Sequence, residues 1–167
     1  MLLTGLLPDI TTDPAIETAT DSVEAGRSGT IVAPVGIRPP LLAAVASRAA
    51  TPLVVLTATG RDAESLTNAL ASWIPGVAML PAWETLPHER LSPQVDTMAR
   101  RIAVLRRLVH PIKGDDSAGP ISVLVVPIRA FLQPIISGLA DLEPVRVRTG
   151  DILDLTETTN RLAELGY

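Results

Sequence analysis

The sequence predicts an α/β protein in which helices flank a mostly parallel sheet, followed by the start of a small α+β second domain. Strand-like segments alternate with helix-like segments, and several strands are apolar at every position, which is typical of strands buried on both faces of a parallel sheet. The 167 residues are 47% hydrophobic, which is enough to bury a core. Four sheet strands are expected: Thr30–Ala33, Leu53–Thr57, Val77–Leu80 and Ile121–Val126.

Capping and turn residues predict where the elements between these strands begin and end. Asp13 is a good N-cap and Pro14 a good first helical residue, so a helix is expected from there to about Ala25. A second helix covers Pro39–Ala50, between the first two strands. Asp62 begins a third, which ends before a Pro-Gly turn.

The second half of the chain continues the alternation. A helix over Gln94–Val109 follows the third strand and is stopped by a His-Pro step, because the residue before a proline disfavours helical geometry. The fourth strand comes after a polar loop. The remaining expected elements are a short helix or irregular segment at Ala130–Leu142, a strand at Val145–Arg148 and a helix at Thr156–Leu165.

A change of composition near residues 141–143 predicts a domain boundary. After it, charge density rises and strand-like residues alternate with arginine. The expected organisation is therefore a helical extension over 1–28, an α/β domain over 29–142, and the beginning of a second domain over 143–167.

Composition excludes several classes of protein. A formal net charge of −4 argues against a surface that coats nucleic acid in general. The chain has no cysteine, which excludes disulfides, thiolate metal ligands and a thiol nucleophile. The start of the chain lacks a signal peptide, and no apolar run reaches the ~18 residues of a membrane span. A soluble, cytoplasmic protein without a membrane partner is expected.

The turn after the first expected strand occupies the place of a phosphate-binding loop in such sheets. A phosphate loop needs several glycines, a lysine, and a serine or threonine for magnesium. Here the turn has Gly36 alone, no lysine and no hydroxyl, while Pro34, Pro39 and Pro40 remove amide donors. We therefore expect this chain to bind no nucleotide or other cofactor. No metal site is expected either, because the two histidines are too few and too differently placed. No catalytic residues are expected.

The loop from Leu80 to Arg90 is the most distinctive stretch, because it carries Trp83, two glutamates and a histidine between prolines. In the following helix Arg101 falls on the apolar arc formed by Met98, Ile102, Leu105, Leu108 and Val109. A buried guanidinium needs a partner, and Glu84 and Glu89 are the nearest carboxylates. The favoured interpretation is a loop held on the helix by Arg101. A contact to nucleic-acid backbone is the alternative.

At these residues the chain resembles the N-terminal region of the bacterial transcription-repair coupling factor, which is itself similar to UvrB, the damage-recognition component of the UvrABC excinuclease. The likeness covers nearly the whole chain and is weakest over the first 28 residues. Its motifs are Trp83-Glu84-Thr85-Leu86-Pro87, Ser92-Pro93, Arg101-Ile102 with Leu105, Val125-Val126-Pro127, Phe131-Leu132-Gln133-Pro134, Gly150 and Leu162–Tyr167. The stretch from Val54 to Arg61 resembles the actinobacterial branch. The structural motif residues are Trp83, Glu84, Pro87, Glu89 and Arg101.

The resemblance implies a fold like the first helicase-like domain of UvrB, with the phosphate loop degenerate and the DNA-clamping hairpin missing between the third strand and the next helix. It implies an intact protein that displaces stalled RNA polymerase from damaged DNA, using ATP and magnesium in a downstream motor, and recruits the excinuclease component UvrA. RNA polymerase and DNA would be bound by downstream domains, and UvrA by the second domain. Arg146 and Arg148, which would share one face of a strand, are the candidate contact residues. The chain itself would be a non-catalytic binding module. The alternative is a nucleotide-binding or DNA-binding α/β domain of a helicase-like protein.

Overall fold

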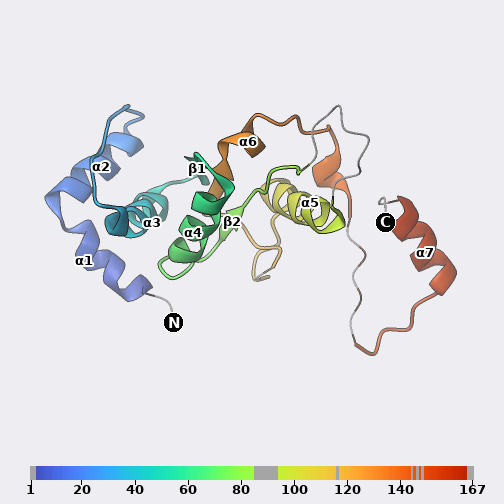
Figure 1. Ribbon diagram of the computed structural model, residues 1–167. Coiled ribbons are helices and arrows are strands. Elements are labelled where there is room, and N and C mark those ends of the chain that lie inside the picture. The colour runs from blue at the N-terminus through green and yellow to red at the C-terminus, as the bar shows by residue number, and fades with distance from the viewer. Residues whose placement is uncertain are drawn as a thin grey trace.

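The computed structural model describes residues 3–84, 94–115, 117–143, 145, 147 and 149–164. Its centre is a three-stranded parallel sheet in the order β1-β3-β2. The strands are β1 (Leu53–Thr57), β2 (Val77–Met79) and β3 (Val123–Pro127). The helices are η1 (Thr4–Leu6), α1 (Leu7–Thr11), α2 (Pro14–Glu24), η2 (Val35–Ile37), α3 (Arg38–Arg48), α4 (Gly60–Leu70), α5 (Val95–Val109), α6 (Ile128–Phe131), η3 (Leu139–Asp141) and α7 (Leu155–Glu164) (Figure 1).

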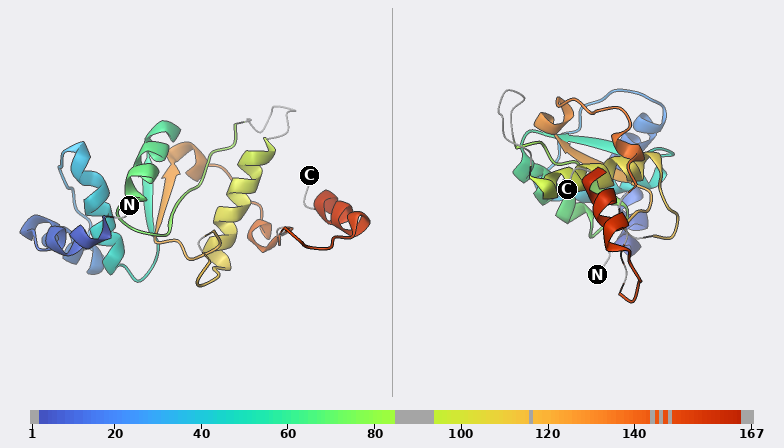
Figure 2. Two further views of the ribbon diagram at one scale, coloured as in Figure 1. Left: turned by 90° about the horizontal axis from the view of Figure 1, so that it is seen from below. Right: turned by 90° about the vertical axis from the view of Figure 1, so that its right-hand side faces the viewer.

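The sheet is covered on both faces, as the run of apolar residues in β3 requires. Every residue of β3 is buried. On one face Val123 and Val125 pack with residues of α3 and α4, including Leu70. On the other face Leu124 and Val126 pack with Val104 and Leu105 of α5. Figure 2 shows α4 and α5 on opposite sides of the strands. The predicted α/β architecture with a parallel sheet is confirmed.

The N-terminal helices pack outside α3. Asp13 caps α2 by accepting hydrogen bonds from the amides of Ala15 (2.9 Å) and Ile16 (3.3 Å), with Pro14 as the first helical residue. This is the start that the sequence predicted. At the far end of α3, Arg48 pairs with Asp21 (2.9 Å) and Glu24 (2.6 Å) of α2. The bridge is exposed, so it orients the two helices more than it stabilises them.

The prediction of a first strand at Thr30–Ala33 is wrong. These four residues lie outside helices and strands, and Val32 is 95% exposed. The sheet pairs the other three expected strands only, so no strand among the described residues pairs with the outer edge of β1. An apolar run becomes a strand only when a neighbouring strand accepts its hydrogen bonds, and none does so here.

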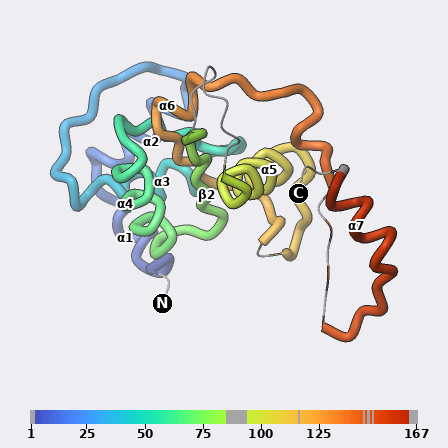
Figure 3. The backbone as a smooth tube through the Cα atoms, turned by 45° about the vertical axis from the view of Figure 1, so that its right-hand side comes forward, coloured from blue at the N-terminus to red at the C-terminus, as the bar shows by residue number. Residues whose placement is uncertain are grey.

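The C-terminal part extends away from the sheet. After α6 the chain turns back along α5 through η3, then runs out to α7 (Figure 3). In Figures 1 and 2, α7 lies at the end of the molecule opposite α1 and α2. The irregular segment expected at Ala130–Leu142 is confirmed, since it contains only the end of α6 and η3. The domain boundary at 142/143 stays a prediction.

Candidate functional site

The end of β2 is held by a side chain from a distant part of the sequence. The amide of Trp83 donates to Oε1 of Gln133 (2.8 Å), and Nε2 of Gln133 donates back to the Trp83 carbonyl (3.2 Å). Gln133 follows α6, which itself follows β3, so the carboxyl ends of two parallel strands are joined here. We call residues 81–84 the Trp83 segment. Sequence reasoning did not single out Gln133 as a contact, although it lies in one of the motifs of the family resemblance.

Arg101 is the only charged residue among the described ones that is fully buried, as its place on the apolar face of α5 predicted. Its Nη1 donates to the carbonyl of Pro81 (2.6 Å), and its guanidinium carbon lies 4.5 Å from the centre of the Trp83 ring. A cation over an aromatic face is attracted by the ring's electron density. Both contacts hold the Trp83 segment against α5.

Two nitrogen donors of the same guanidinium have no acceptor among the described residues. Within the described part of the chain, Nε and Nη2 of Arg101 are buried and have no hydrogen-bond partner. Burial lowers the pKa of Arg101 below the usual guanidinium value, because desolvation disfavours the charged form. The side chain stays charged at neutral pH, since arginine starts far above it.

Glu84 does not pair with Arg101, so that part of the expectation is wrong. Its carboxylate instead accepts a hydrogen bond from the hydroxyl of Thr97 on α5, and its backbone carbonyl accepts one from Nη2 of Arg129 (3.1 Å). The geometry explains the difference: Thr97 lies one turn before Arg101 on α5, and its hydroxyl donates to the Glu84 carboxylate, while Nη1 of Arg101 bonds to the backbone of Pro81. Glu89 and Pro87, the other residues of the expected motif, lie outside the described residues.

The hydroxyl of Thr97 lowers the pKa of Glu84, because a hydrogen bond to a carboxylate favours its charged form. The contact therefore contributes stability above the ordinary glutamate pKa and loses it as the pH falls through the lowered value. Thr97→Val should raise the pKa of Glu84 toward its ordinary value, and should destabilise the protein at neutral pH but not in acid. A carboxyl-carbon NMR titration measures the pKa. The control is Thr67→Val, which removes a hydroxyl that donates a hydrogen bond to the carbonyl of Ala63 within α4. This change should leave the pKa of Glu84 unchanged.

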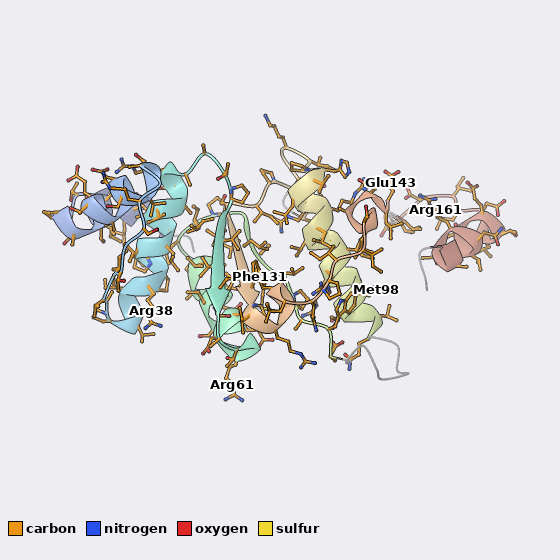
Figure 4. The ribbon with its side chains drawn as sticks, turned by 90° about the horizontal axis from the view of Figure 1, so that it is seen from above. Arg38, Arg61, Met98, Phe131, Glu143 and Arg161 are labelled. Carbon is orange, nitrogen blue, oxygen red and sulfur yellow. The ribbon has the colours of Figure 1, made fainter. Side chains whose placement is uncertain are left out.

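The apolar arc of α5 is rotated relative to the expected one. Its buried residues are Thr97, Arg101, Val104 and Leu105, whereas Leu108 and Val109 are exposed. The last turn of α5 instead binds the segment after α6. Nη1 of Arg106 donates to the carbonyl of Leu142 (3.2 Å), and Nε2 of His110 lies 2.7 Å from Oδ1 of Asp141. Figure 4 shows Glu143, 3.8 Å from Arg106, beside this end of the helix. Sequence reasoning missed this junction, which has no local signal.

The turn that the sequence placed at the phosphate-loop position forms η2 and the start of α3, although no strand precedes it. Pro34 precedes η2, Gly36 lies within it, and Pro39 and Pro40 are the second and third residues of α3. Neither proline has an amide hydrogen, and the amide of Arg38 already donates to the carbonyl of Val35. The first three residues of α3 therefore offer no free amide of the kind that binds phosphate.

The predicted contact site at Arg146 and Arg148 lies outside the described residues, so the proposed role of both arginines stays a prediction. The strand expected around them is not formed at Val145 and Val147, which lie outside helices and strands. Across the described ranges, no group of three histidine, aspartate or glutamate residues could hold a metal ion. Nor is any described helix long and apolar enough to cross a bilayer.

Comparison with known proteins agrees with the resemblance. No family model matches the chain. The transcription-repair-coupling factors of Mycobacterium bovis and Mycobacterium tuberculosis are each 45% identical to it over 141 residues, which is 83% of this chain and 11% of the relative. The Escherichia coli factor is 29% identical over 96 residues, which is 57% of this chain and 8% of the relative.

The higher identity to the mycobacterial proteins agrees with the expected actinobacterial branch. The chain spans about a tenth of the length of these relatives, and 11% in the mycobacterial case. It belongs to the transcription-repair-coupling factor family and corresponds to the N-terminal region of those proteins.

Proposed function

We propose that this chain is a non-catalytic binding module of a transcription-repair-coupling factor. In the longer family protein, a motor outside the matched region would use ATP and magnesium to displace stalled RNA polymerase from damaged DNA, and the excinuclease component UvrA would be recruited for repair. RNA polymerase and DNA would be bound elsewhere in that protein. The 45% identity to the mycobacterial factors supports the placement in this process.

The observation that carries the non-catalytic role is the start of α3. Nucleotide-binding α/β proteins place phosphates against free amides at the N-terminus of the helix that follows a glycine-rich turn. The first turn of α3, which the sequence suggested for this role, holds Pro39 and Pro40, which have no amide hydrogen. The other requirement, a lysine near the turn, is not met by residues 33–40 either.

Titration with ATP and magnesium tests this role directly. We expect no saturable heat of binding in isothermal calorimetry at ligand concentrations where a working P-loop protein, run as the control, is saturated. Saturable binding in the micromolar range, together with ATP hydrolysis, would show that the chain is an enzyme and would overturn the proposal.

We also assign the contact with UvrA to the second unit, beginning at residue 143. Its described residues lie mostly exposed, with Ile152 and Leu155 facing solvent, so this described part lacks a buried core of its own. This chain should therefore bind UvrA weakly or not at all, whereas the full-length mycobacterial factor should bind. A pull-down comparing the two tests the assignment. Equal retention of both would place the contact within residues 1–167, and Arg146 and Arg148 would be the first residues to substitute.

A further inference from the structure

The chain leaves the sheet and its covering helices just after η3, where the last turn of α5 binds it. Nη1 of Arg106 donates to the carbonyls of Leu142 (3.2 Å) and Asp141 (3.4 Å). Nη2 of Arg106 lies 3.8 Å from Oε1 of Glu143, and Nε2 of His110 lies 2.7 Å from Oδ1 of Asp141. We call these contacts of Arg106 and His110 the α5 latch.

The direction of the unit that follows is set at this point. Residues 151–154 are exposed and lie outside helices and strands, and they lead into α7, whose described residues are mostly exposed. In Figures 1 and 2, α7 stands apart from α5 and from the sheet. A unit joined in this way takes its orientation from the last residues that are held, so the α5 latch is placed to control it.

The contacts of the α5 latch are of two kinds. The side chains of His110, Asp141 and Glu143 are 47%, 67% and 70% exposed, and exposed ion pairs contribute little and are screened by salt. Arg106 is 20% exposed, and its hydrogen bonds to two backbone carbonyls are the stronger part, because the donor is charged. A latch built in this way is weak enough to open while the protein stays folded.

The residues just before the α5 latch are held differently. Leu139 and Ala140 of η3 are partly buried and pack against the apolar cluster that contains Val104 and Leu105 of α5. Because burial of apolar surface holds η3 in place, the loss of a few polar contacts beyond it leaves η3 on the helix. The pivot for any movement of the second unit therefore lies at residues 141–143.

We propose that the α5 latch is a reversible device with two states. In the engaged state, Arg106 and His110 hold residues 141–143 on α5 and give the second unit one orientation. In the released state, the unit turns about these residues. Rising ionic strength shifts the equilibrium toward release, because the exposed ion pairs are screened. This device acts on orientation alone, whichever partner the second unit binds.

The distance between two spin labels, measured by pulsed electron resonance, tests the α5 latch. The chain has no cysteine, so Ala71→Cys at the end of α4 and Val147→Cys, both at exposed positions, give one labelled pair. We expect a narrow distance distribution at low salt, and a second, broader component that grows as the salt rises to about 1 M. Arg106→Met should increase the released fraction at low salt on the order of tenfold, because the charged donor to two carbonyls is lost.

The matched control is Arg107→Met, on the next residue of α5. Nε of Arg107 donates to the carbonyl of Gly119 (2.8 Å), which is not part of the α5 latch, so the distance distribution should stay narrow. The double change Asp141→Asn with Glu143→Gln weakens the latch without altering α5, and should broaden the distribution by a smaller factor than Arg106→Met. An unchanged protein with a distribution as broad as that of Arg106→Met, or equal broadening in Arg107→Met, would show that the α5 latch does not set the orientation.

Discussion

Arg101→Ala should lower the free energy of unfolding by about 3 kcal/mol, because it removes a fully buried side chain and leaves a cavity beneath Trp83. Arg101→Met should cost about 1 kcal/mol or less. Methionine fills most of the volume and needs no hydrogen bonds, and replacing a buried charge by an apolar residue is often close to neutral. Urea unfolding, followed by circular dichroism, measures both variants.

The contrast between the two variants separates packing from charge. If Arg101→Met also loses about 3 kcal/mol or more, a charged partner must satisfy Nε and Nη2. Glu89→Gln would then identify that partner by producing a matching loss. Arg100→Met is the control, because Arg100 is exposed and pairs with Asp96 on its own helix (2.8 Å), so the loss there should stay below about 0.5 kcal/mol.

Gly76→Ala should destabilise the protein by about 3 kcal/mol or more, the sum of a left-handed backbone penalty and of overpacking. Gly76 has φ +74°, and a Cβ there would lie 2.8 Å from the carbonyl oxygen of Pro120 and 2.9 Å from Oγ of Ser122. The Gly76 carbonyl also accepts the amide of Ser122 (2.8 Å), so the turn cannot move away from the entry to β3 without losing this bond.

Gly26→Ala provides the matched control for this prediction. Gly26 has φ +64°, but nothing lies within 4 Å of its Cβ position. Only the backbone penalty of about 1–2 kcal/mol applies there. Thermal unfolding of both variants gives the comparison, and equal losses would show that the close approach to Pro120 and Ser122 relaxes at little cost.

The sequence predicted those parts of the fold that depend on local or periodic signals. Asp13 and Pro14 identify the start of α2 because capping acts within one turn. The burial of Arg101 follows from helical periodicity. Its acceptor could not be predicted, because the Pro81 carbonyl is a backbone group that no side-chain pattern marks. The outcome for Thr30–Ala33 has the same cause: an apolar run shows that a segment can form a strand, but not whether a partner strand lies beside it.

The two ends of α5 hold different parts of the chain, so the helix connects them mechanically. Thr97 and Arg101 fasten the Trp83 segment near its start, whereas Arg106 and His110 hold residues 141–143 at its end. A helix of 15 residues is a stiff rod about 22 Å long. A force applied to the chain after residue 143 would therefore act through α5 on the carboxyl end of the sheet, where β2 and β3 are joined through Gln133.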